Sequence, residues 1–92
     1  MIATVSEKWS ARYVRIWLDG IEITKDCRYA NEERGMVQVV ARYASGEIRT
    51  NDYEYGVEWD VKFGKVKIAL RENAPDWAKE IYNSKRNEIG AL

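Results

Sequence analysis

A carboxylate and a lysine two residues apart could form half of a metal-dependent nuclease site in this chain. Asp60 and Lys62 flank Val61 in an alternating segment, so both side chains would lie on one face of a strand. In such a site the carboxylate holds a divalent ion and the lysine helps to activate water. Asp52 or Glu58 could supply a further carboxylate. Because any strand with a charged face gives this pattern, we interpret it as solvent-facing and keep a nuclease as a distant alternative.

Two other groups carry reactive side chains without a catalytic neighbour. Glu32 and Glu33 could pair as carboxylates, but adjacent strand residues point to opposite faces, and acids are ordinary in turns. Cys27 could act as a nucleophile, but the chain has no His to serve as its base. We interpret Cys27 as a small buried hydrophobic residue. The sequence therefore predicts a non-enzymatic protein with no catalytic residues, no metal site and no cofactor.

Aromatic and arginine side chains favour binding over catalysis. Tyr13, Arg15 and Trp17 share one face of a predicted strand, and Tyr53 and Tyr55 lie in a predicted loop. Tyr, Trp and Arg are the residue types that anchor protein interfaces. We predict that these five residues form a contact for a protein partner or for self-association.

Two alternatives apply to the same aromatic residues. Trp17 could be a core residue covered by a second layer, such as the C-terminal helix. The aromatics could also stack on single-stranded nucleic acid, on a small β-barrel, with the help of Arg15, Arg28, Arg42 and Arg49. The charge balance disfavours this second alternative, because 15 basic and 15 acidic residues cancel.

Length and composition indicate the kind of molecule that positions these residues. The 92 residues, of which 46% are hydrophobic, predict a single domain over 1–92. No signal peptide or membrane-spanning run is expected, and the first Met favours a complete gene product. A single Cys fits a reducing compartment. We therefore expect a cytoplasmic protein that makes no membrane contact.

Alternation with period two dominates residues 10–71 and predicts strands. Asp19-Gly20 between residues 12–18 and 21–24 predicts a hairpin with a type I′ turn, in which Leu18 opposes Ile21 and Trp17 opposes Glu22. Gly64-Lys65 predicts a second hairpin, joining residues 57–63 to 66–70. In that hairpin Trp59, Val61 and Phe63 would form a buried face against the return strand.

The remaining segments complete the predicted sheet and add one helix. Residues 36–43 predict a central strand, and Tyr43 is expected to oppose Ile48 across a turn at 44–46. Residues 31–35 predict a turn in which Gly35 adopts positive φ. Asn73, Pro75 and Asp76 predict the start of a helix over about 74–85, with Trp77 packed in the core.

The stretch Ile16-Trp-Leu-Asp-Gly-Ile-Glu-Ile-Thr-Lys-Asp-Cys27, with Ala30-Asn-Glu-Glu-Arg-Gly-Met-Val37 after it, resembles small uncharacterised proteins of tailed phages and prophages. Residues 16–37 carry this resemblance. It implies a small protein that acts by binding in an infected bacterium, either inside the host cell or associated with the virion. It implies no catalytic residue.

Together these patterns predict an α+β domain. We expect an antiparallel β-meander of about five or six strands, rolled or barrel-like, with one C-terminal helix. The predicted function is protein binding of the phage or prophage type, as an accessory protein, an assembly protein or an inhibitor of a host system.

Overall fold

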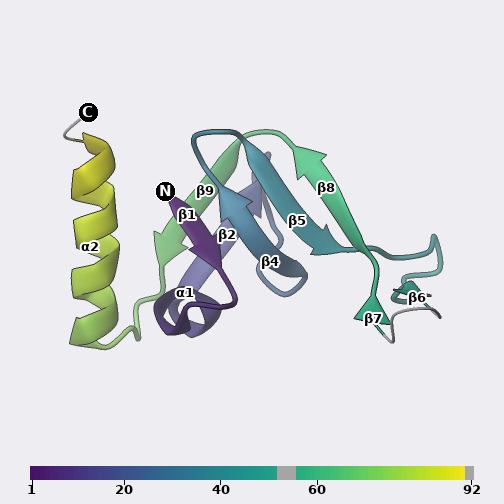
Figure 1. Ribbon diagram of the computed structural model, residues 1–92, viewed down its shortest axis with the longest axis horizontal. Coiled ribbons are helices and arrows are strands. Elements are labelled where there is room, and N and C mark those ends of the chain that lie inside the picture. The colour runs from purple at the N-terminus through teal and green to yellow at the C-terminus, as the bar shows by residue number, and fades with distance from the viewer. Residues whose placement is uncertain (52–55, 91–92) are drawn as a thin grey trace.

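The computed structural model describes residues 1–51 and 56–90, which form two stacked antiparallel sheets and a C-terminal helix (Figure 1). A four-stranded sheet has the order β1-β4-β5-β8. Its strands are β1 (Ile2–Thr4), β4 (Cys27–Asn31), β5 (Met36–Val40) and β8 (Trp59–Phe63). A three-stranded sheet has the order β3-β2-β9. Its strands are β2 (Val14–Leu18), β3 (Ile21–Glu22) and β9 (Val66–Leu70).

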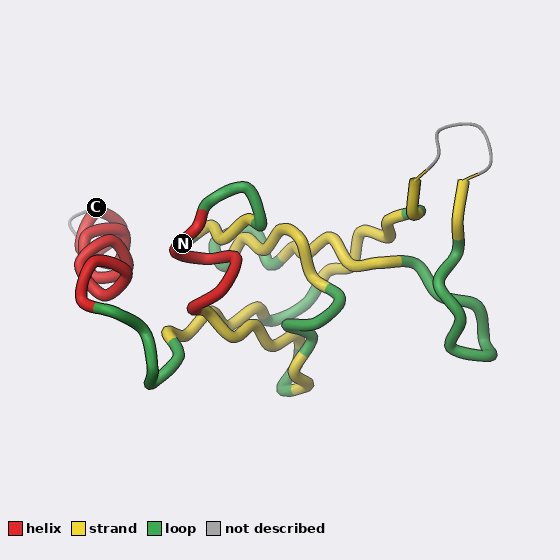
Figure 2. Tube along the Cα trace, turned by 90° about the horizontal axis from the view of Figure 1, so that it is seen from below, coloured by secondary structure: helices red, strands yellow, loops and turns green. Residues whose placement is uncertain are grey.

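Short elements flank these two layers. The ribbon of β6 (Thr50–Asn51) and β7 (Gly56–Val57) extends from one end, and α2 (Asp76–Gly90) lies at the opposite end (Figure 2). Helix α1 (Lys8–Tyr13) joins β1 to β2. The predicted α+β class with antiparallel strands and a C-terminal helix is confirmed, while the two sheets do not close into a barrel. Within the described ranges no helix is long and apolar enough to cross a bilayer.

The core lies between the two sheets. Alternate residues of the four-stranded sheet, such as Ala30 and Val37, face Ile16 and Ile68 of the three-stranded sheet, and all four are buried. Trp9 of α1 is also buried, and it contributes a large apolar side chain to a core made mostly of small residues. Neither α1 nor β1 is expected from the sequence pattern.

The short helix α1 gave no clear signal in the sequence because its stability comes from tertiary contacts. It has six residues, and the Glu7 side chain makes no capping hydrogen bond. The Ser10 hydroxyl donates to the Thr4 carbonyl oxygen over 2.5 Å, while Trp9 packs in the core. Isolated helices of this length are unstable in water. The predicted strand over 12–18 consequently begins two residues later, at Val14.

The β2–β3 hairpin is confirmed in turn type and register. Asp19 has φ +50° and Gly20 has φ +83°, as a type I′ turn requires. Leu18 opposes Ile21 and Trp17 opposes Glu22. The Ile23 amide also donates to the Ile16 carbonyl oxygen over 2.8 Å.

The predicted hairpin between residues 57–63 and 66–70 is wrong. Strand β8 pairs with β5 and strand β9 pairs with β2, so Gly64-Lys65 crosses from one sheet to the other. Gly64 lacks the positive φ that a type II′ turn needs at its first position. The Asp19 carboxylate instead accepts the Lys65 amide over 2.8 Å, which ties the crossing to the β2–β3 turn.

Three smaller expectations also need correction. Ile48 opposes Arg42 and not Tyr43, a shift of one residue, although Gly46 turns the chain with φ +92° as the turn at 44–46 requires. Helix α2 begins at Asp76, because the Pro75 carbonyl oxygen accepts the first helical amides, from Ala78 and Lys79.

Trp77 is also not a core residue. Its side chain is 44% exposed, and Ala78 is the buried residue of the first turn of α2. The Trp77 ring meets Tyr13 edge-on instead, with ring centroids 5.5 Å apart. Trp9 is the tryptophan that packs in the core on this side, and it belongs to a segment for which no helix was predicted.

Candidate protein-binding surface

Trp17 lies on the outer face of the three-stranded sheet and is half-buried. Its place opposite Glu22 and Lys67 points it away from the core. The Arg15 guanidinium carbon lies 5.1 Å and Lys67 Nζ lies 5.2 Å from the centroid of the Trp17 ring. These distances suit cation–π contacts, and long basic side chains can cover a ring with their alkyl parts. Trp17 is therefore a surface residue partly covered by side chains of its own sheet.

Arg15 is held in an ion pair beside Trp17. Its Nε and Nη2 donate to the two Glu22 carboxylate oxygens over 3.0 and 2.7 Å. The Thr24 hydroxyl donates to the same carboxylate over 2.8 Å. The Arg15 hydrogen bonds, followed by that of Thr24, lower the pKa of Glu22 to about 2. At neutral pH the pair carries no net charge, so Lys65 and Lys67 supply the positive charge in the shallow hollow beside Trp17.

The structure does not bring all five predicted binding residues together. Arg15 and Trp17 share the outer face, as expected. Tyr13 lies at the end of α1, where it packs against the core and against Trp77. Tyr53 and Tyr55 lie outside the described residues.

A second surface, which the sequence analysis placed in the core, covers the outer side of the four-stranded sheet. Val37 and Val39 of β5 are buried, and they oppose Lys62 and Asp60 of β8. The inner side of β8 is therefore its charged side. The apolar side of β8 faces outward, where Val61 is 49% and Phe63 is 71% exposed.

Neighbouring strands extend this apolar surface. Met36 opposes Phe63, and Val40 opposes Trp59. Arg28 of β4 lies over the Trp59 ring at 4.3 Å and donates to Gln38 over 3.0 Å. We call the side chains that share this side the β8 face; they are Arg28, Met36, Gln38, Val40, Trp59, Val61 and Phe63. The predicted inward orientation of Trp59, Val61 and Phe63 is therefore wrong.

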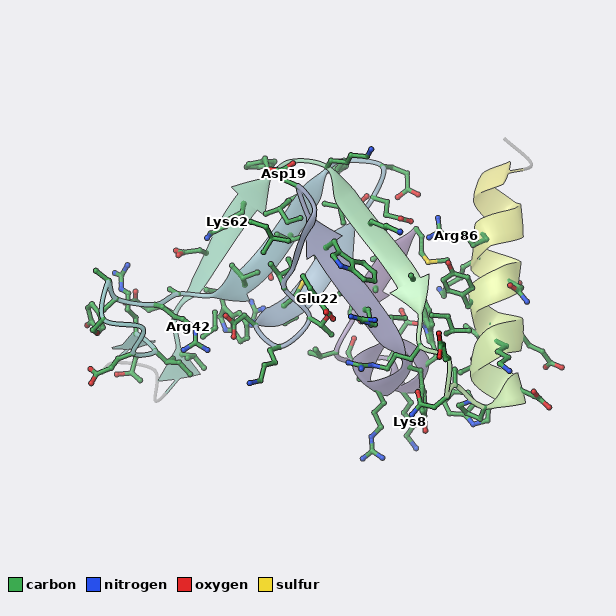
Figure 3. The ribbon with its side chains drawn as sticks, turned by 180° about the vertical axis from the view of Figure 1, so that it is seen from behind. Lys8, Asp19, Glu22, Arg42, Lys62 and Arg86 are labelled. Atoms are coloured by element: carbon green, nitrogen blue, oxygen red, sulfur yellow. The ribbon has the colours of Figure 1, made fainter. Side chains whose placement is uncertain are left out.

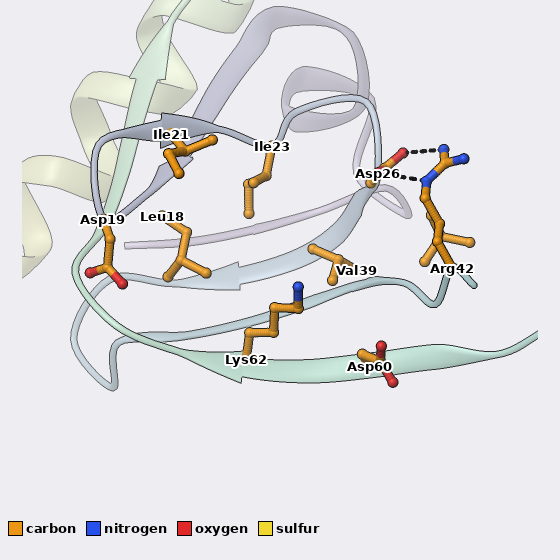
Figure 4. A pocket seen from close by; sticks show the side chains of 10 residues that line it. Leu18, Asp19, Ile21, Ile23, Asp26, Val39, Arg42, Asp60 and Lys62 are labelled. Atoms are coloured by element: carbon orange, nitrogen blue, oxygen red, sulfur yellow. Dashed lines mark hydrogen bonds and ion pairs between the residues drawn. The ribbon is translucent and has the colours of Figure 1, made fainter. Parts of the chain in front are cut away.

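Asp60 and Lys62 line a cleft of about 360 Å³ between β8 and the β2–β3 hairpin (Figure 4). Leu18, Ile21 and Ile23 form the opposite wall. At one end Arg42 closes the cleft through an ion pair with Asp26, with nitrogen–oxygen distances of 2.8 and 3.1 Å.

Among the described residues, the cleft does not bring together the carboxylate set that a nuclease site needs. Arg49 pairs with Glu58 over 2.8 Å, and Asp52 lies outside the described residues. Among the described residues no group of three or more His, Cys, Asp or Glu side chains is placed to hold a metal ion. Two other carboxylates line the cleft with Asp60. Asp19 belongs to the β2–β3 turn, and Asp26 is already bound by Arg42.

Cys27 occupies the small-residue position that the sequence analysis assigned to it. It is buried, and its thiol donates to the Tyr29 carbonyl oxygen over 3.1 Å. Burial raises the pKa of the Cys27 thiol to about 11. The thiol is therefore protonated at neutral pH and is a poor nucleophile.

Glu32 joins distant parts of the fold. Its carboxylate accepts the Ile68 amide over 2.9 Å and pairs with Arg86 of α2 at 2.9 Å. The Met1 amino group lies 3.6 Å from the same carboxylate and also pairs with Glu33. Figure 3 shows Arg86 reaching from α2 toward the sheets. The two acids therefore act as structural anchors for the chain start and for α2.

The sequence pattern alone could not predict the outward position of the β8 face. Perfect alternation over residues 57–63 correctly indicates a strand with one apolar and one charged side. It does not reveal which side turns inward, since that depends on the partner strand. The pairing of Val37 and Val39 with Lys62 and Asp60 settles the orientation, and this pairing spans more than twenty residues of chain.

The arrangement defines a two-sheet α+β domain with an outward apolar sheet face. Comparisons with protein-family models, with curated proteins and with solved structures gave no match to this chain.

Proposed function

We propose that this chain is a small non-enzymatic protein-binding protein and that the β8 face is its binding surface. The observation that carries the proposal is the outward placement of Trp59, Val61 and Phe63 on a sheet face. Isolated exposed apolar residues are normal, but contiguous apolar patches on a small domain mark interaction sites.

The composition of the β8 face supports this proposal. Aromatic residues, Met and Arg are enriched in protein interfaces, and the face contains Phe63, Trp59, Met36 and Arg28. Arg28 already lies over Trp59, which holds both side chains in place before a partner arrives. Such preorganisation lowers the entropy cost of association.

The proposed setting is that of phage and prophage proteins. It rests on the resemblance over residues 16–37 and places the protein in a bacterial cytoplasm or on a virion. The partner would be a protein of the host or of the particle.

Capture of partners from a bacterial lysate tests the proposed surface. We expect immobilised parent protein to retain a partner that Phe63→Ser loses, because the substitution removes the most exposed aromatic ring of the β8 face. Ile21→Ser is the matched control, since Ile21 is 70% and Phe63 is 71% exposed. Equal recovery by the parent and both variants would exclude the β8 face as the binding surface.

A second candidate function is binding of single-stranded nucleic acid through the Trp17 surface. The observation that favours it is that Arg15 and Lys67 both lie within cation–π distance of the Trp17 ring, with Lys65 lining the same hollow. Bases stack on exposed aromatic rings, and lysines contact phosphates. This function predicts oligonucleotide binding that weakens steeply as salt rises and that Trp17→Ala abolishes. Lack of binding at low salt would exclude it.

A further inference from the structure

Strand β8 forms one of the two edges of the four-stranded sheet. This strand is the last in the order β1-β4-β5-β8 and, within the described residues, pairs with β5 on one side. Next to it along the ladder, Ala41 donates to the Glu58 carbonyl oxygen and Gly64 donates to the Gly35 carbonyl oxygen, both over 2.9 Å. Hydrogen-bonded pairs alternate along an antiparallel ladder. Asp60 and Lys62 therefore direct their backbone groups toward β5.

It follows that the alternate residues of β8 direct their backbone groups to the open edge. These residues are Trp59, Val61 and Phe63, the same three whose side chains lie on the β8 face. An edge of this kind offers a row of donors and acceptors to another strand. Strand β8 has no proline, and its pairing with β5 has no register shift that would bend it away.

The sequence of β8 is complementary to itself when reversed. An antiparallel copy centred on Val61 sets Trp59 opposite Phe63 of the partner subunit and Asp60 opposite Lys62 of the partner subunit. Aromatic pairs and opposite charges are both favourable across strands. Charged residues often protect edge strands from pairing. Here they would instead select one register.

The neighbouring registers are unfavourable for the same reason. If the partner strand shifts by two residues in one direction, Asp60 lies opposite Asp60 of the partner subunit. A shift in the other direction sets Lys62 opposite Lys62 of the partner subunit. Like charges directly opposite each other are destabilising. The register centred on Val61 also pairs all five strand residues.

We infer that a second copy of this chain binds along β8 and forms a symmetric dimer with a continuous sheet. The two-fold axis passes beside Val61, perpendicular to the sheet, and relates two identical edges. Val61 forms a hydrogen-bonded pair with Val61 of the partner subunit. Asp60 and Lys62 of the partner subunit form a non-hydrogen-bonded pair, in which side chains lie closest.

The dimer also joins the two β8 faces. Strands paired in this way keep equivalent faces on one side of the sheet, so the outward rings of both copies would lie together. Two of the other edge strands are shorter, because β1 has three residues and β3 has two. The five-residue edge strand β9 is already covered, since the Glu32 carboxylate accepts the Ile68 amide and Arg86 donates to the Ile68 carbonyl oxygen. The inference goes beyond the proposed function, since it uses the backbone edge and the inner charges of β8 in addition to the Trp59 and Phe63 rings of the β8 face.

Sedimentation equilibrium on the intact chain tests the dimer. We expect the parent to dimerise reversibly. Asp60→Lys alone and Lys62→Asp alone should each weaken dimerisation about tenfold or more, because two attractive pairs become two repulsive pairs. The double variant Asp60→Lys/Lys62→Asp should dimerise like the parent, and a mixture of the two single variants should form heterodimers.

Lys67→Asp is the matched control, because it makes the same charge change on an exposed strand residue of the other sheet. It should dimerise like the parent. A monomeric parent would overturn the inference, and so would single variants that dimerise normally or a double variant that stays monomeric. Circular dichroism would confirm that each variant is folded.

The outcomes also separate the dimer from the proposed function. Asp60 and Lys62 lie on the inner side of β8, so their variants leave the β8 face unchanged. Lysate capture that persists with a monomeric parent would retain the proposed function and reject the dimer. A dimer that captures no partner would retain the dimer and reject the proposed function.

Discussion

Glu22 shows how one ion pair sets the titration of an exposed carboxyl. The Arg15 hydrogen bonds are the main cause that lowers its pKa from 4.5 to about 2. We predict that Arg15→Ala raises the pKa of Glu22 most of the way back toward 4.5, with Thr24 retaining a part of the shift. A pH titration of the Glu22 side-chain carboxyl by NMR measures this.

The sign of the stability effect follows from the direction of that shift. The folded pKa of Glu22 lies below the unfolded value, so the stabilisation is present above about pH 4.5 and is lost as the pH falls toward 2. Arg12→Ala, which removes another exposed arginine, should leave the titration unchanged. An unchanged Glu22 pKa in Arg15→Ala would contradict the assignment of the cause.

Cys27 gives a second prediction at the residue scale. Burial raises the pKa of its thiol from 9.0 to about 11. We expect the native protein at pH 8 to react with a thiol reagent far more slowly than the urea-unfolded chain, because the thiolate is the reactive form. Since the folded pKa is the higher one, the thiol destabilises the fold as the pH rises from about 9 to 11. Equal labelling rates in both states would contradict burial of Cys27.

At the scale of elements, the turn between β4 and β5 meets the crossing between β8 and β9. Gly35 has φ +61°, as the sequence predicted, and a Cβ atom there would lie 2.6 Å from the Gly64 carbonyl oxygen. We predict that Gly35→Ala lowers the free energy of unfolding by about 2–4 kcal/mol, because it adds a backbone collision to an unfavourable φ.

Gly46→Ala is the matched control for this prediction. Gly46 also has positive φ, but nothing lies within 4 Å of a Cβ atom there. Its cost should be about 1 kcal/mol, from the backbone conformation alone. Urea denaturation of both variants measures the difference, and equal losses would show that the contact between Gly35 and Gly64 is unimportant.

The elements that were predictable from the sequence are those whose partners are local. Asp19-Gly20 encodes its own turn, so the β2–β3 register followed from two residues. Gly64-Lys65 offered a similar signal, but its two strands pair with β5 and β2, which are far from them in the sequence. The same limit hid the β8 face, because the side of β8 that turns inward depends on β5. Of the predicted binding residues, only Arg15 and Trp17 could be placed on one face from the sequence, because the local β2–β3 pairing determines that face.

At the scale of the whole molecule, the C-terminal helix is joined to the sheets through a small polar cluster. Arg86 donates to the Tyr82 hydroxyl over 3.1 Å, to the Ile68 carbonyl oxygen, and to the Glu32 carboxylate over 3.2 Å. Trp9 and Tyr82 pack edge-on beside this cluster, with centroids 6.4 Å apart. Helix α2 therefore depends on the turn after β4 and on α1 as well as on its own sequence.

This dependence makes Glu32 a residue whose loss should loosen an element fifty residues away. We predict that Glu32→Gln destabilises the fold by about 1.5–3 kcal/mol, because Arg86 and the Met1 amino group lose a charged partner that is mostly shielded from solvent. The exposed neighbour Glu33 provides the control, and Glu33→Gln should cost less than about 1 kcal/mol.

A double-mutant cycle of Glu32→Gln with Arg86→Gln, followed by urea denaturation, isolates the link between the turn and α2. We expect a coupling free energy of about 0.5–3 kcal/mol. Hydrogen exchange should show faster opening of α2 than of β5 in Glu32→Gln, because the helix loses an anchor while the sheet pairing is untouched. Additive losses with uniform exchange would mean that α2 is held by its apolar contacts through Ala78, Ile81 and Tyr82 alone.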